Sequence, residues 1–167
     1  MKIRIIAIGK IKEAYLKAGI DEYLKRIKPY SSIEIIEVLD EPVVDNPNES
    51  QIKLVKDKEG QKVLKLIRPS DYVISLDLNK KELNSEAFAA FLGKKFEIGK
   101  SFITFIIGGS YGLSDELKLR ANDSISLSKM TFLHQMSRLI LLEQIYRAFK
   151  INRNEVYHKW YMKNLHI

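Results

Sequence analysis

The run FITFII, residues Phe102–Ile107, constrains the fold more than any other stretch of this chain. Its apolar and β-branched residues do not alternate with charged ones, which predicts a strand buried on both faces. Three glycines follow within five residues: Gly108, Gly109 and Gly112. Glycine accepts positive φ and lets a ligand approach the backbone, so this loop is a candidate binding site. GGSYG lacks the spacing of a dinucleotide site, and the sequence holds no P-loop motif for a nucleoside triphosphate.

Strands and helices alternate along the chain, which predicts one α/β domain, residues 1–167, with a mainly parallel sheet flanked by helices. We expect strands at residues 2–8, 32–39, 72–78, 102–107 and 124–127, with a polar turn, Asn79-Lys80-Lys81, after the third. We expect helices at 11–28, 51–67, 84–98 and 132–150, and a short helix capped by Ser114. Ligands of such folds bind beyond the carboxyl ends of the strands, which are residues 76–80, 108–112 and 127–132.

The last predicted helix is apolar nearly all round its middle, at residues 139–142. A surface helix has one apolar stripe, so this pattern predicts two buried faces. One face would cover the sheet. The other would contact a second helix, which belongs either to the same chain or to a second subunit.

The composition excludes several kinds of site. There is no cysteine, which excludes disulfides, thiolate zinc sites and a cysteine nucleophile. Three histidines lie far apart in the sequence, so we expect no metal. The apolar N-terminal run is too short for a signal peptide, and no stretch reaches the length of a membrane span. We therefore expect a cytoplasmic protein with no membrane contact.

The net charge of +7 indicates a polyanionic partner. More than half of this excess lies from Arg147 onward, where five cations oppose one acid, Glu155. Tyr157, Trp160 and Tyr161 stand among these cations, a composition that suits backbone phosphates and stacked bases. The other interpretation of the segment is an ordinary solvated basic tail.

Several motifs, in this order and spacing, together point to one family. They are IGGSYGLSD at 107–115, SLSKMTFLHQMS at 126–137, EQIYRAFKI at 143–151 and YHK at 157–159. IRIIAIGKIKE at 3–13, DKEGQKVL at 57–64 and SLDL at 75–78 match as well. The chain resembles the bacterial 23S rRNA pseudouridine N3-methyltransferases, minimal members of the SPOUT superfamily.

The resemblance implies a C-terminal trefoil knot at about 101–151, followed by a basic aromatic tail, residues 152–167. It implies a homodimer whose sites are built from both subunits, which favours the second subunit as the partner of the last helix. It implies a pseudouridine substrate in 23S rRNA, within the large subunit or the 70S ribosome. S-adenosylmethionine would bind in a bent form among the knot loops, and the motif match places it against Leu76, Gly108, Leu127, Ser128, Lys129, Met130, Thr131 and Phe132.

Two features depart from the family pattern. Lys80 stands where the family usually has glycine, so the turn beside Leu76 is expected to differ. The chain also continues for eight residues, 160–167, past the family's terminal motif.

The implied reaction needs N3 of the base to lose its imide proton before it attacks the methyl group. His158 is a candidate base, because its ordinary pKa lies near neutrality. Arg147 is a candidate for the cation that stabilises the developing charge, with Glu143 as its orienting partner or as an alternative base. Glu143 and Arg147 are also spaced for a simple helix salt bridge. Tyr157 would stack on the target base or anchor the tail.

Arg138, Lys150, Arg153 and Lys159 are candidate RNA contacts. His134 follows the Met130–Phe132 motif, and we interpret it as part of the helix start. Three rival functions remain open: a non-catalytic RNA-binding ribosome-assembly factor, a SPOUT methyltransferase acting on tRNA, and a nicotinamide-dependent oxidoreductase.

Overall fold

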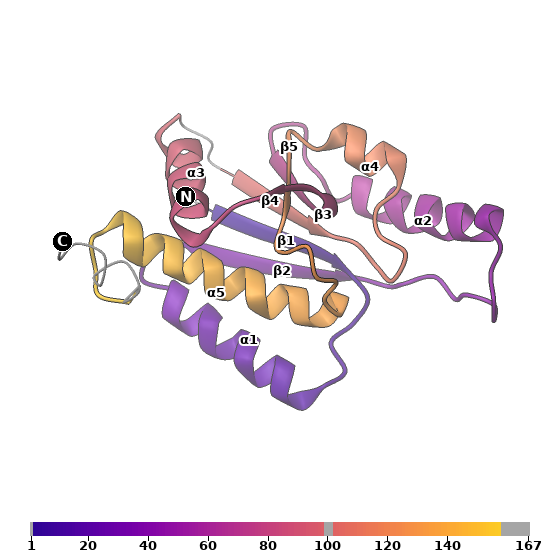
Figure 1. The fold of residues 1–167 in the computed structure, drawn as a ribbon, viewed down its shortest axis with the longest axis horizontal. Coiled ribbons are helices and arrows are strands. Elements are labelled where there is room, and N and C mark those ends of the chain that lie inside the picture. Colours follow the sequence, from indigo (N-terminus) through magenta and orange to yellow (C-terminus); the bar gives the residue numbers. More distant parts are fainter. Residues whose placement is uncertain (1, 99–101, 158–167) are drawn as a thin grey trace.

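A computed structural model describes residues 2–98 and 102–157 of the chain. Strands and helices alternate there as predicted (Figure 1). The strands are β1 (Lys2–Ile8), β2 (Ser32–Val38), β3 (Tyr72–Glu82), β4 (Phe102–Ile107) and β5 (Asp123–Ser126). The helices are α1 (Ala14–Ile27), α2 (Glu49–Leu64), α3 (Ser85–Glu97), α4 (Asp115–Arg120) and α5 (His134–Asn152).

The five strands form one sheet in the order β2-β1-β4-β3-β5, and every neighbouring pair is parallel. β1 lies inside the sheet, where Ile5 pairs with Ile35 of β2 on one side and with Phe105 of β4 on the other. The predicted α/β class and parallel sheet are therefore confirmed. The trefoil knot stays a prediction.

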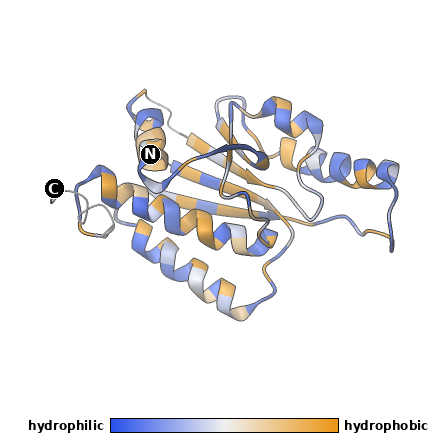
Figure 2. Ribbon diagram, in the orientation of Figure 1, coloured by the Kyte–Doolittle hydropathy of each residue, from blue (hydrophilic) through white to orange (hydrophobic). Residues whose placement is uncertain are grey.

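Two helical layers cover the sheet because alternate strand residues point to opposite faces. Ile3, Ile5 and Ala7 of β1 belong to the core under α1, α3 and α5, whereas Ile6 and Ile8 belong to the smaller core under α2 and α4. Figure 1 shows α1 and α5 side by side, and Figure 2 shows that the strands between the layers are largely apolar. This double cover explains why β4 has no polar face.

α5 packs against the sheet and between α1 and α3 of its own chain. Gly19 of α1 permits a close approach, because a Cβ at this position would stand 3.1 Å from Leu139 of α5. Leu141, Leu142 and Ile145 are fully buried within the single chain. The two covered faces predicted for this helix thus have partners inside one subunit, and the apolar pattern alone does not require a second one.

β3 is longer than predicted. The expected turn, Asn79-Lys80-Lys81, is part of a strand that continues to Glu82. Both Leu76 and Lys81 pair with Ile125 of β5, so residues 77–80 bulge out of the ladder between them. Lys80 is not among the residues with positive φ, so the bulge accepts this lysine without backbone strain. Among the described residues, no helix is both long and apolar enough to cross a bilayer.

Candidate active site

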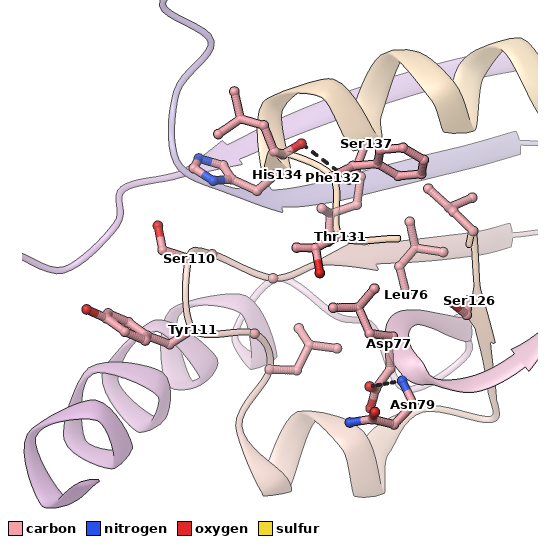
Figure 3. Close-up of a pocket in the computed structure, with 18 of the residues that line it drawn as sticks. Leu76, Asp77, Asn79, Ser110, Tyr111, Ser126, Thr131, Phe132, His134 and Ser137 are labelled. Atoms are coloured by element: carbon pink, nitrogen blue, oxygen red, sulfur yellow. Dashed lines mark hydrogen bonds between the residues drawn. The ribbon is translucent and has the colours of Figure 1, made fainter. Parts of the chain in front are cut away.

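A cavity of about 730 Å³ opens beyond the carboxyl ends of β3, β4 and β5 (Figure 3). The three loops predicted to carry the site meet there. Every residue proposed for the cofactor lines the cavity except Lys129. Asp77, Asn79, Tyr111 and His134 line it too, and Lys56 of α2 and Lys118 of α4 reach it from the flanking helices. These two lysines were not predicted from the sequence, because their position depends on how the helices pack.

The glycine loop is shaped by its own backbone. Gly112 has φ +83°, and its N–H donates to the Gly109 carbonyl at 3.0 Å. A Cβ on Gly108 would stand 2.8 Å from the carbonyl carbon of Gly112, closer than side chains approach backbone. Gly108 is therefore required for the loop to close on itself, in addition to any need of a ligand. Ser114 ends the loop and caps α4 as predicted, accepting a hydrogen bond from Leu117 N.

The loop between β5 and α5 forms the opposite wall of the cavity. The Ser126 hydroxyl donates to the Ser128 carbonyl at 2.8 Å, and Met130 N donates to the Ser128 hydroxyl at 3.0 Å. These two bonds fix the turn while the side chain of Met130 stays exposed. Leu133 at the start of α5 is exposed as well. The rim of the cavity thus carries uncovered apolar side chains.

Arg138 is not a surface residue, so the prediction that it contacts RNA is wrong for this structure. It is fully buried. Its guanidinium donates to Glu37 Oε1 at 2.8 Å and to the carbonyls of Ile8 and Gly9 at 3.0 and 2.6 Å. Arg138 therefore fastens the first turns of α5 to the ends of β1 and β2. His134 begins α5 as expected, and burial, together with the nearby Arg138, lowers its pKa, which favours the neutral imidazole.

Three of the four proposed catalytic residues lie together: Glu143 and Arg147 in the second half of α5, and Tyr157 in the segment that follows it. Arg147 Nε donates to Glu143 Oε1 at 3.0 Å, and the Tyr157 hydroxyl donates to the same oxygen at 3.3 Å. The Arg147 guanidinium stands 4.8 Å from the centre of the Tyr157 ring. The Tyr157 ring also packs edge-on against Tyr146, with 4.8 Å between centroids. Within this chain Tyr157 thus anchors the segment that follows α5.

The environment of Tyr157 keeps its hydroxyl protonated. Burial raises the pKa of Tyr157, and the hydrogen bond with Tyr23, whose hydroxyl is 3.4 Å away, raises it further. A protonated phenol remains a hydrogen-bond donor to Glu143 at neutral pH. His158, the fourth proposed catalytic residue, lies outside the described residues.

This cluster is separated from the cavity along the same helix. Ser137 lines the cavity, and neither Glu143 nor Arg147 does. At 1.5 Å per residue, Glu143 is about 9 Å and Arg147 about 15 Å further along the axis of α5 than Ser137. One chain therefore does not bring the two halves of the predicted site together.

The remaining RNA candidates lie beyond the cluster. Glu155 accepts a hydrogen bond from Lys150 at 2.5 Å, and this bond raises the pKa of Lys150. Arg153 is exposed, with its guanidinium 4.7 Å from the centre of the Tyr30 ring. Lys159 is outside the described residues. No group of three or more metal-ligating side chains occurs in the part of the chain that the structure describes.

Comparison of the sequence with known proteins identifies the family of this chain. Residues 1–158 match the family model described as "Predicted SPOUT methyltransferase". A protein of Carboxydothermus hydrogenoformans named Ribosomal RNA large subunit methyltransferase H is 55% identical over 159 residues, which cover 95% of this chain and 100% of that one. The protein of the same name from Bacillus thuringiensis is 52% identical over the same shares of both chains. The chain therefore belongs to the SPOUT methyltransferase family.

Proposed function

We propose that this chain transfers the methyl group of S-adenosylmethionine to N3 of a pseudouridine in 23S rRNA, in the cytoplasm and on the large subunit or the 70S ribosome. Family membership supports the reaction class, and the name of its relatives supports rRNA as the substrate. The observation that carries the proposal is the cavity in which the three strand-end loops meet.

The residues of the cavity fit the cofactor. Its volume is in the range of small-molecule sites. Leu76, Ile107 and Phe132 provide apolar surface for a purine ring, and the glycine loop exposes backbone, since a Cβ on Gly112 would meet no atom within 4 Å. When bound, S-adenosylmethionine supplies a methyl group on a positively charged sulfur. When a nucleophile attacks the methyl carbon, the sulfur leaves with the electrons of the S–C bond and becomes a neutral thioether.

The cluster of Glu143, Arg147 and Tyr157 would act on the base that receives the methyl group. Arg147 is the cation that would stabilise the negative charge on the deprotonated base. Glu143 accepts from Arg147, Gln144 and Tyr157, so its oxygens are already engaged. This arrangement favours Glu143 as the residue that orients Arg147 and disfavours it as the base. His158, one position after Tyr157, remains our candidate for the base.

We infer a homodimer in which the cluster of one subunit faces the cavity of the other. The distance between cluster and cavity within one chain supports this arrangement. The exposed Leu78, Met130 and Leu133 at the cavity rim support it too, because soluble proteins cover contiguous apolar surface.

Mass spectrometry of rRNA from a deletion strain tests the function. We expect one methyl group to be missing from a 23S pseudouridine, to return with the wild-type gene, and to remain absent with Arg147→Met. Calorimetry separates the rivals. A protein with no affinity for S-adenosylmethionine would be an RNA-binding assembly factor, and one that binds NADH instead would be an oxidoreductase. A protein that binds S-adenosylmethionine, from a deletion strain whose rRNA has lost no methyl group, would be a methyltransferase acting on tRNA.

A further inference from the structure

The wall of the cavity contains an ion pair of two residues, Asp77 and Lys118. Asp77 follows Leu76 at the start of the bulge in β3, and Lys118 projects from α4. Lys118 Nζ is 3.3 Å from Asp77 Oδ2. The side chain of Asp77 is only 10% exposed, whereas that of Lys118 is 37% exposed. Asp77 Oδ1 accepts a hydrogen bond from Asn79 N at 3.1 Å, which fixes the direction of the carboxylate.

The charges of the cavity are unevenly distributed. Asp77 is the single carboxylate among the described residues that line it, and Lys56 and Lys118 are its two lysines. Figure 3 shows the Asp77 carboxylate beside Asn79, turned away from Thr131 and Phe132. One end of the cavity therefore presents both signs of charge, and the other presents apolar and hydroxyl groups.

Two parts of an adenosyl ligand could use a buried carboxylate. Ribose hydroxyls would donate to Asp77 and accept from Lys118, but they are neutral, so they would not replace the opposite charge that each of these side chains now faces. An α-amino acid carries an ammonium and a carboxylate on the same carbon atom, so it matches a carboxylate and an ammonium that already stand next to each other. The pairing of Asp77 with Lys118 favours the second part.

We propose that Asp77 and Lys118 form the subsite for the amino-acid end of S-adenosylmethionine, with Asp77 accepting from the ligand ammonium and Lys118 donating to the ligand carboxylate. This inference rests on the proposed function. The ion pair seen here opens or rotates to admit the zwitterion, and the Asn79 bond keeps Asp77 in place meanwhile.

Two ligands test the assignment. S-adenosylhomocysteine has the amino-acid end, and 5′-methylthioadenosine keeps the adenine, ribose and thioether but lacks that end. Calorimetry with the wild-type protein is expected to give tighter binding of S-adenosylhomocysteine. Asp77→Asn keeps the shape and the bond to Asn79 and removes the charge. This variant should lower the affinity for S-adenosylhomocysteine about 10- to 100-fold, which is the effect of one charged hydrogen bond. The affinity for methylthioadenosine should stay unchanged.

The second variant and the controls make the result specific. Lys118→Met keeps the apolar stem of the side chain. It should lower the affinity for S-adenosylhomocysteine less than Asp77→Asn does, because Lys118 is more exposed than Asp77. Lys53 and Asp57 form an ion pair on α2 outside the cavity, 2.6 Å apart, and both side chains are more exposed than those of Lys118 and Asp77. Asp57→Asn and Lys53→Met should change neither affinity.

Three results would overturn the proposal. Equal weakening of both ligands by Asp77→Asn would assign Asp77 to the ribose, and no weakening of either would remove it from the site. A wild-type protein that binds neither ligand would contradict the cofactor assignment itself, and with it the inference that depends on it.

Discussion

Gly108 illustrates how one residue without a side chain controls a whole loop. We expect Gly108→Ala to lower the affinity for S-adenosylmethionine at least tenfold, because its Cβ would force the backbone of Gly112 to move. Gly93→Ala is a matched control, since a Cβ there would meet only the end of the Asn152 side chain, remote from the cavity. Calorimetry measures the affinity of both variants, and circular dichroism checks that they are folded. A folded Gly108→Ala protein with full affinity would show that the loop tolerates the shift.

Arg138 is a charged residue whose side chain stabilises the interior of the protein instead of its surface. Arg138→Met would remove the side-chain donor of the Ile8 and Gly9 carbonyls and leave Glu37 Oε1 with the Ile11 N–H as its remaining donor, so we expect a loss of about 3–5 kcal/mol in the free energy of unfolding. Arg153→Met makes the same change at an exposed position and should alter stability by less than about 0.5 kcal/mol. Urea unfolding measures both values. Equal stabilities would mean that the buried network around Arg138 contributes nothing.

At the scale of elements, the segment after α5 separates cofactor binding from methyl transfer. A chain ending at Val156 loses Tyr157 and the family's terminal motif but keeps the whole cavity. We expect it to bind S-adenosylmethionine normally and to transfer no methyl group to ribosomes in single-turnover assays. A chain ending at Lys159 should keep most of the turnover. Full activity after the shorter truncation would remove Tyr157 and His158 from the mechanism.

Elements also show where prediction from sequence succeeds and fails. The strands were predictable because β-branched apolar runs identify buried strands, and the cavity followed from the ends of β3, β4 and β5. The bulge in β3 was missed, because Asn79-Lys80-Lys81 has the composition of a turn and only its pairing with β5 makes it a strand. Arg138 was misplaced because its partners, Ile8 and Gly9, are about 130 residues away in the sequence. Lys56 and Lys118 reach the cavity only through the packing of their helices.

At the scale of the whole molecule, the composite site can be tested by mixing two inactive proteins. Arg147→Met keeps its cavity, and Gly108→Val keeps its cluster. Refolded together at equal amounts, half of the dimers would be mixed and each would have one complete site, which predicts about a quarter of the wild-type activity. Each variant refolded alone is the control. A mixture as inactive as its components would place both halves of the site in the same chain.

The position of β1 inside the sheet has a consequence for biosynthesis. Ile5 finds its β2 partner 30 residues later, but its β4 partner, Phe105, emerges only after 100 residues. At about 5–20 residues per second, a ribosome leaves one edge of this apolar strand unpaired for about 5–20 s. Chains interrupted before residue 102 leave β1 with one unpaired edge, so nascent chains of this protein are expected to need a chaperone until β4 has left the ribosome.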